Sequence, residues 1–217
     1  MPRGSAQATG DTDALEALLG RIRGCRRCID DPIGRPLPHQ PRPVIRVSAD
    51  TRIIVCGQAP GTRVHASGLP FDDASGDRLR EWMGVDRDTF YDVSQIGTVP
   101  MGFCFPGNDT KGGDLPPRRE CAKAWHAQVF PLLPAARLIL LVGHYAQAYH
   151  LGDRRKQSLT DTVAAFGDYL NAAAIPRLLP LPHPSWRNSG WLKRNPWFAA
   201  ELLPRLRRQV ATTLANR

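Results

Sequence analysis

The sequence predicts an α/β fold, a three-layer sandwich in which a central, mostly parallel sheet of about four strands is flanked by helices. Three apolar runs of strand length, residues 51–56, 136–142 and 176–181, each stop at a loop rich in Gly or Pro. Continuous apolar runs are typical of strands buried on both faces, and helical patterns such as residues 76–83 separate them. Because ligands of such sheets bind beyond the carboxyl ends of the strands, the three loops should converge on one site.

The length of the chain predicts a single domain over residues 1–217. A chain of this length, with 42% hydrophobic residues, can bury an ordinary core without covalent staples. Within this domain, residues 1–45 are expected to form a helix and a proline-rich arm that carry the first two cysteines. Apolar side chains at helical spacing predict the helix over residues 13–23, and the prolines between residues 30 and 43 exclude regular strand pairing.

The chain is basic, and most of its basic residues are arginine. Lys and Arg number 29 against 20 Asp and Glu, for a formal net charge of +9, and only four of the 29 are lysine. The planar fork of Arg suits phosphates and base edges, so a polyanionic partner is one interpretation, and the Arg codons of a GC-rich genome are the other. A closing helix predicted over residues 197–210, which Pro204 should kink, is Arg-rich on one face. No apolar stretch reaches the roughly 20 residues of a membrane helix and the start lacks a signal-peptide pattern, so a cytoplasmic protein with no membrane partner is expected. A monomer is also expected.

Four of the five cysteines form two pairs. Cys25 and Cys28 make a C-x2-C step, and Cys104 and Cys121 enclose a loop of Pro, Gly and Asp. Because the cytoplasm keeps thiols reduced, metal ligation is favoured over disulfides, and four thiolates complete either a tetrahedral zinc site or a cubane iron–sulfur cluster. The spacing does not choose between them, and four unconnected thiols are the remaining alternative. Cys56 lies inside the first apolar run, where a free thiol packs as a small hydrophobe.

Several motifs occur in an order that resembles one enzyme family. They are Gly57-Gln58-Ala59-Pro60-Gly61, Ser67-Gly-Leu-Pro-Phe71, the strand–Gly–helix pattern over residues 136–152 and Leu181-Pro-His-Pro-Ser185, together with the cysteine spacing. Their order and spacing resemble the uracil-DNA glycosylase superfamily, closest to its iron–sulfur branch, family 4, with divergent active-site motifs. The resemblance implies a monofunctional DNA glycosylase that flips a deaminated or damaged base, with uracil as the leading candidate, and hydrolyses its N-glycosidic bond in base excision repair. It also implies that the partner is nucleoid DNA. It further implies a 4Fe-4S cluster, with zinc as the alternative occupant, bound by four ligands: Cys25, Cys28, Cys104 and Cys121.

Under this resemblance, the loops bind the flipped base and the DNA backbone. Gly57, Ala59 and Gly61 let main-chain N–H groups approach the ligand, and Pro60 fixes the turn. Phe71 offers a flat face to the flipped base, and plain core packing is the alternative role for this ring. The other expected base- or DNA-binding residues follow the second and third apolar runs: Gly143, His144, Ser185, Arg187 and Asn188.

Catalysis is expected to depend on His183 and on a group that handles water. His183 lies between two prolines at the end of the third run, where its imidazole can stabilise the negative charge of the departing base. For the water, Gln58 is favoured because loss of a dissociating base needs charge stabilisation more than a strong nucleophile. His65 as a base, and Asp72 or Asp73 as a carboxylate, are the alternatives.

The motifs depart from the family-4 pattern at the positions that carry this chemistry. In that branch the first motif reads GEAPG and an acidic pair follows, whereas Gln58, Val64 and His65 occupy these positions here. Pro100 stands where the branch has an Asn that reads the base. These departures support a second hypothesis, an iron–sulfur protein that binds nucleic acid and keeps the pocket without the hydrolysis.

Overall fold

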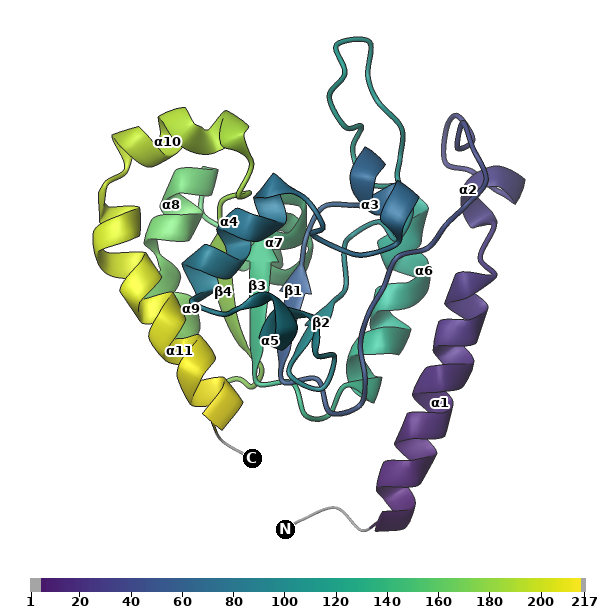
Figure 1. Ribbon diagram of the computed structural model, residues 1–217, viewed down its shortest axis with the longest axis horizontal. Coiled ribbons are helices and arrows are strands. Elements are labelled where there is room, and N and C mark those ends of the chain that lie inside the picture. The colour runs from purple at the N-terminus through teal and green to yellow at the C-terminus, as the bar shows by residue number, and fades with distance from the viewer. Residues whose placement is uncertain (1–4, 216–217) are drawn as a thin grey trace.

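A computed structural model describes residues 5–215, without the side chains of residues 5–9 and 11, and its centre is a four-stranded parallel sheet. The strand order is β2 (Ile96–Thr98), β1 (Ile53–Cys56), β3 (Leu138–Val142) and β4 (Arg177–Leu181). In the register, Ile53 pairs with Ile96 and Leu138, and Leu138 pairs with Arg177. Helices cover both faces of the sheet (Figure 1), so the predicted three-layer α/β sandwich is confirmed.

Alternate residues of the two central strands enter different hydrophobic cores. Ile54 of β1 and Ile139 of β3 pack in one core, whereas their neighbours Ile53 and Leu138 pack in the other. Successive side chains of a strand point to opposite faces, so each strand supplies both cores. Every residue of β1, β2 and β3 is therefore buried, which is why these strands have continuous apolar runs rather than alternating ones.

The first core lies under helices from the beginning and the middle of the chain. These helices are α1 (Ser5–Arg23), α6 (Arg119–Val129) and α7 (His144–Leu151). α1 buries Leu15, Leu18, Leu19 and Ile22 in this core, at the spacing that predicted the helix. After the short α2 (Arg27–Asp30), residues 31–45 form no helix or strand, as the prolines predict.

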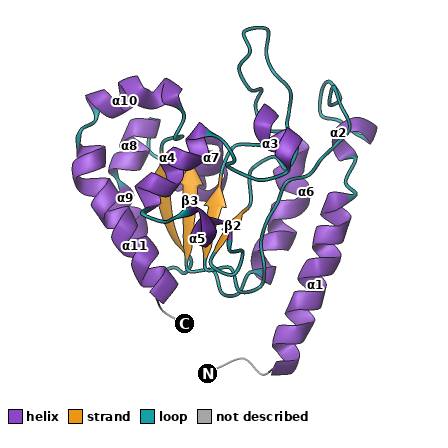
Figure 2. Ribbon diagram, in the orientation of Figure 1, coloured by secondary structure: helices purple, strands orange, loops and turns teal. Residues whose placement is uncertain are grey.

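The second core lies under α4 (Ala74–Met83) and α11 (Leu203–Ala215), which pack against each other on the opposite face (Figure 2). The remaining short helices and turns connect the layers: α3 (Thr62–Ser67), α5 (Arg87–Tyr91), α8 (Leu159–Ala164), α9 (Phe166–Leu170), α10 (Ser189–Arg194), η1 (Phe130–Leu132), η2 (Gly152–Arg154) and η3 (Trp186–Asn188). Within residues 5–215, no helix is long and apolar enough to cross a membrane.

Two details differ from the sequence-based expectation. The strand β2 has only three residues, and its Gly97 interrupts the apolar pattern because a Cβ there would lie 2.7 Å from Cγ2 of Thr51. The closing helix is longer than predicted and contains a π turn, η4 (Phe198–Leu202), directly before α11, which begins next to Pro204. Pro204 has no N–H to donate to the carbonyl four residues earlier, and the wider turn accommodates this loss.

Candidate active site

A cavity of about 310 Å³ lies beyond the carboxyl ends of β1, β2 and β4. Its walls come from the loop after β1, the segment before α4, the loop after β2, the loop after β4 and one side chain of a long loop that rises above α3 (Figure 1). The lining residues include Gly57, Gln58, Ala59, Pro60, Gly61, Phe71, Asp73, Pro100, Asp114, His183, Ser185, Arg187 and Asn188. A volume of this order suits a small planar ligand.

Phe71 lies against the loop that follows β1. A Cβ on Gly57 would stand 3.2 Å from Cζ of Phe71, so the missing side chain at residue 57 makes room for the ring. The backbone of Phe71 is held at φ 55°, a left-handed conformation that bulky residues rarely adopt. Its carbonyl accepts hydrogen bonds from the Tyr91 hydroxyl at 3.2 Å and from Arg80 Nη1 at 3.3 Å, and it lies where a Cβ on Gly76 would overlap it. Several contacts therefore enforce a strained backbone at the cavity wall.

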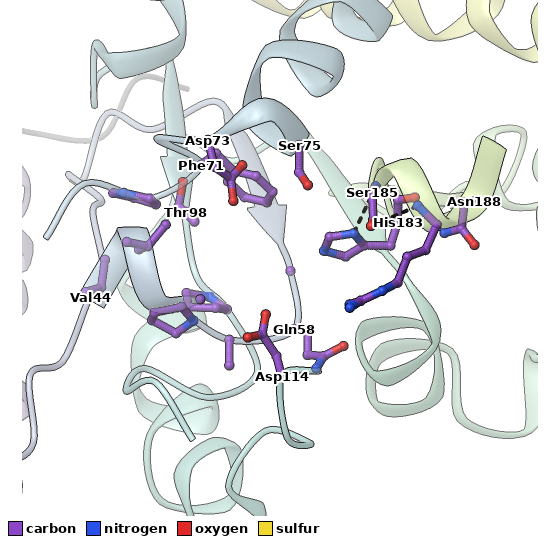
Figure 3. A pocket seen from close by; sticks show the side chains of 18 residues that line it. Val44, Gln58, Phe71, Asp73, Ser75, Thr98, Asp114, His183, Ser185 and Asn188 are labelled. Carbon is purple, nitrogen blue, oxygen red and sulfur yellow. Dashed lines mark hydrogen bonds between the residues drawn. The ribbon is translucent and has the colours of Figure 1, made fainter. Parts of the chain in front are cut away.

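His183 faces the same cavity from the loop after β4 (Figure 3). The backbone N–H of Ser185 donates to its Nδ1 at 3.2 Å, so in the neutral ring the proton is on Nε2. Burial lowers the pKa of His183 below its ordinary value, although the nearby carboxylates of Asp73 and Asp114 act in the opposite direction. The site therefore holds a neutral imidazole whose Nε2–H is free to donate to a ligand.

The loop that carries His183 is fixed by side chains from two other segments. Asn188 Nδ2 donates to the carbonyl of His183 at 2.7 Å. Arg78, on α4, donates from Nη1 to the carbonyls of Pro184 and Ser185, at 3.3 and 3.1 Å. Beside this loop the ring of Trp186 is 71% exposed, and the guanidinium of Arg187 lies 5.5 Å from its centre. An aromatic and a basic side chain thus form an exposed surface next to the cavity.

The structure separates the residues that the sequence proposed for handling water. Gln58 and Asp73 line the cavity, but Oδ1 of Asp73 accepts a hydrogen bond from the N–H of Gly76 at 2.9 Å and caps α4. Asp72 does not line the cavity and pairs with Arg87 Nη2 at 3.2 Å. His65 also lies outside the lining, with its ring centre 4.3 Å from that of His39, and burial lowers its pKa.

The loop after β3 supports the site without lining it. Gly143 adopts φ 85°, and a Cβ there would lie 3.7 Å from Cβ of His183. His144 is not among the lining residues, and its Nδ1 lies 3.3 Å from Arg155 Nη1. Gly143 thus packs close to His183, and the base- or DNA-binding role of Gly143 and His144 stays a prediction.

Sequence reasoning missed Asp114, which lies on the loop between the third and fourth cysteines. This side chain lines the cavity, and Oδ2 lies 3.3 Å from the point where a Cβ on Gly61 would stand. Gln58 Nε2 donates to the carbonyl of Leu115 at 3.3 Å, so the loop after β1 and this long loop are joined. The sequence assigned the long loop to the metal site, and no local pattern marks one of its aspartates as facing the cavity.

The four predicted metal ligands surround a second, very small cavity. Cys25, Cys28, Cys104 and Cys121 line it together with Phe103 and Trp125. The N–H of Phe103 donates to Sγ of Cys121 at 3.2 Å, and burial raises the thiol pKa of Cys28 to about 11 and of Cys104 to about 12. Among residues 5–215, no group of three or more His, Cys, Asp or Glu side chains is arranged to hold a metal ion.

The fifth cysteine lies apart from this group. Cys56 is completely buried in β1, and burial raises its pKa. It contacts the first hydrophobic core, as its position in an apolar run predicts.

A parallel sheet and a cavity at its carboxyl edge, lined by a histidine and an aromatic ring among others, define an α/β protein with a candidate site for a small ligand. The family model of the uracil DNA glycosylase superfamily matches residues 45–207, about three quarters of the chain, so the chain belongs to this superfamily. Membership supports a DNA glycosylase, a hydrolase of N-glycosyl bonds that acts on DNA. The first cysteine pair, Cys25 and Cys28, precedes the matched region.

Proposed function

We propose that this protein is a monofunctional DNA glycosylase that flips a deaminated or damaged base, with uracil as the leading candidate, and hydrolyses its N-glycosidic bond in base excision repair. It acts as a monomer on nucleoid DNA and belongs to the iron–sulfur branch, family 4. The observation that carries the proposal is the neutral imidazole of His183, whose Nε2–H has no partner within residues 5–215 and faces a base-sized cavity.

The cavity suits the two demands of base release. A flipped base needs a flat surface to replace the stacking that it loses, and the ring of Phe71 supplies one. As the N-glycosidic bond breaks, negative charge develops on the base and positive charge on the sugar. A fixed, neutral donor such as His183 stabilises that negative charge without having to reorient during the reaction. The ring and the donor lie on adjoining walls of one cavity (Figure 3).

DNA binding is proposed for the surface next to His183. Arg187 supplies a guanidinium that can bind phosphate, and the neighbouring Trp186 supplies an exposed aromatic ring. In such a pair the ring inserts into DNA and the basic group contacts the DNA backbone. Asn188 acts on this surface through its hydrogen bond to the carbonyl of His183. DNA contact and base chemistry thereby share one loop.

A 4Fe-4S cluster is proposed for the four cysteines. Support comes from their convergence: Cys25 follows α1, Cys28 lies in α2, Cys104 follows β2 and Cys121 lies in α6, yet all four line one cavity. In a cubane, each cysteine binds a different iron. The four cysteine sulfurs therefore lie farther apart than four sulfurs that all bind one zinc ion, each at about 2.3 Å from the metal. Zinc on the same four thiolates is the alternative occupant, and metal analysis of the purified protein distinguishes the two. When bound, the cluster would tie the residues before β1 to the loops at the carboxyl edge of the sheet.

The proposal is tested with a panel of oligonucleotides that each carry one lesion, in single and double strands. Purified protein is incubated with each substrate without divalent cation, and abasic sites are then cleaved with alkali. We expect a free base and an intact abasic site from at least one lesion. Tight binding to DNA without excision of any lesion would replace the glycosylase with the alternative, a nucleic-acid-binding protein that keeps the pocket.

A further inference from the structure

The geometry points to Asp114 as the carboxylate that receives a proton from the attacking water and faces the positive charge of the sugar. This inference rests on the proposed glycosylase function and adds to it a catalytic residue from outside the strand-end loops. It also gives a role to the long loop of residues 105–117, which projects above α3 (Figure 1).

Contacts on both sides position Asp114, although its side chain is exposed. Its Oδ1 accepts a hydrogen bond from Asn108 Nδ2 at 3.2 Å, and the two residues form an antiparallel bridge across the base of the loop. The next residue, Leu115, donates its N–H to the carbonyl of Gly107 at 2.9 Å and accepts the hydrogen bond from Gln58. These contacts fix the carboxylate in place before a ligand arrives, as a catalytic group requires.

The second carboxylate oxygen of Asp114 remains available to a ligand. Oδ2 accepts no hydrogen bond from any residue between 5 and 215, and it lies 3.3 Å from the point where a Cβ on Gly61 would stand. A side chain at residue 61 would therefore crowd this oxygen. The absence of a side chain at Gly61 lets the long loop bring a carboxylate over the loop that follows β1.

Asp114 and His183 stand on different walls of the cavity. Figure 3 shows Asp114 beside Gln58 and away from the group formed by His183 and Ser185. The two are close enough that the charge of Asp114 raises the pKa of His183 against the effect of burial. A donor on one wall and a carboxylate on another match a transition state that carries negative charge on the base and positive charge on the sugar.

The other aspartates near the cavity are less available. Oδ1 of Asp73 accepts a hydrogen bond from the N–H of Gly76 and is engaged in the cap of α4. Asp72 is paired with Arg87 and does not line the cavity. Among the described lining residues, Asp73 and Asp114 are the two carboxylates, and Asp114 is the one whose oxygens bind no backbone amide.

The step balances as a hydrolysis. The bond between C1′ and the base nitrogen breaks, and its electron pair leaves with the base, whose charge His183 stabilises. The water oxygen forms the new bond to C1′, and one of its protons passes to the carboxylate of Asp114. The base anion then takes up a proton, from Asp114 or from solvent, which yields the free base and a hydroxyl on C1′.

The test compares Asp114→Asn with Asp109→Asn. An Asn at residue 114 keeps the shape and can still accept from Asn108, but it cannot take a proton. Asp109 lies on the same loop and does not line the cavity, and both of its hydrogen bonds, from the N–H of Lys111 and Gly113, go to Oδ1, which Asn retains. The pair therefore differs in position with respect to the cavity and not in chemistry.

We expect Asp114→Asn to slow single-turnover base release by about 10²–10⁴-fold, the range for loss of a general base. Affinity for DNA with a non-cleavable analogue of the excised nucleotide should be unchanged or tighter. Asp109→Asn should retain the wild-type rate. Formate should partly restore base release in Asp114→Ala, a response that a purely structural residue would not give.

Three results would overturn the assignment. The first is an active wild type together with an Asp114→Asn variant whose rate of base release is within threefold of the wild-type rate. This result would leave the proposed function intact. The second is loss of base release in Asp73→Asn while Asp114→Asn stays active, which would assign the role to Asp73. The third is a wild type that excises no lesion in the panel, which would overturn the proposed function and this assignment together.

Discussion

The backbone N–H of Ser185 donates a hydrogen bond to Nδ1 of His183 at 3.2 Å. This bond requires a lone pair on Nδ1, so it favours the neutral ring with its proton on Nε2. If Nδ1 were protonated, its N–H and the N–H of Ser185 would face each other with no acceptor between them. A short turn after β4 thus selects both the charge and the tautomer of the residue that faces the base.

Replacement of His183 by Ala should slow base release by about 10²–10³-fold, the effect of removing one preorganised donor from a developing anion. Single-turnover kinetics at saturating protein measure the chemical step apart from DNA binding. His183→Gln is the matched variant, because its side-chain amide can donate from a nearby position and should recover part of the rate. Equal rates for wild type and His183→Ala would contradict the role of this imidazole.

Replacement of Phe71 by Ala should weaken binding of lesion-containing DNA by about 1–3 kcal/mol, the contribution of one base–aromatic stack. Phe71→Tyr keeps an aromatic face and should bind with nearly wild-type affinity. The comparison uses equilibrium binding to a non-cleavable analogue. A loss of thermal stability in Phe71→Ala with unchanged DNA affinity would show that the ring acts in packing with Phe90, which it meets edge-on at 6.1 Å.

Replacement of Arg187 by Ala should lower the slope of log K against log salt by about one unit, the effect of one lost phosphate contact. Arg177 is the matched control because it begins β4, at the opposite edge of the sheet from the cavity. Arg177→Ala should leave the slope unchanged. The reverse outcome would move the DNA-binding surface to the amino edge of the sheet.

Protein purified without oxygen should be brown and contain about four iron atoms per chain, the content of one cubane held by four thiolates. Cys25→Ser and Cys121→Ser should each lose the colour. Cys56→Ser should keep it, because Cys56 packs in β1 away from the cavity of the other four. Metal analysis that finds stoichiometric zinc and no iron would contradict the cluster.

The sequence located the parts of the site that follow long apolar strands. The runs that became β1, β3 and β4 place Gly57, Gly143 and His183 at one edge of the sheet, since parallel strands all end there. It could not locate Asp114, because the hydrogen bond from Gln58 to the carbonyl of Leu115 joins loops 57 residues apart. Such contacts depend on how a loop folds back, and local propensity does not encode them.

The same limit applies to side chains that support the site from other elements. No sequence pattern marks Arg78 of α4, yet its side chain donates hydrogen bonds to the carbonyls of Pro184 and Ser185. Asp72 and Asp73 are adjacent and chemically identical, but Asp72 pairs with Arg87 and Asp73 caps a helix and lines the cavity. Only the packing of the loops distinguishes the two.

Two histidines, the buried His126 and the half-buried His150, should make the fold sensitive to mild acid. His126 and His150 lie with ring centres 5.7 Å apart, and burial lowers the pKa of each to about 4. His126 Nε2 bonds the carbonyl of Pro100, a cavity residue, at 3.0 Å, whereas Nδ1 of His126 and Nε2 of His150 have no hydrogen-bond partner in the part of the chain that the structure describes. At His126 the Pro100 carbonyl opposes the effect of burial only in part, and at His150 the nearby His126 adds to that effect.

The unfolded chain binds these protons at an ordinary histidine pKa of about 6.5, so between pH 6.5 and 4 it binds more protons than the folded chain. The contribution of these two residues to the free energy of unfolding should therefore be constant above pH 6.5. Below pH 6.5 the free energy of unfolding should fall, by up to about 2 kcal/mol per histidine at pH 5. Urea unfolding of wild type and His150→Leu at pH 7.5 and pH 5 measures the effect. His150→Leu should lose less stability between the two pH values than wild type, because the leucine has no proton to bind in the unfolded chain, and an equal loss in both proteins would contradict the prediction.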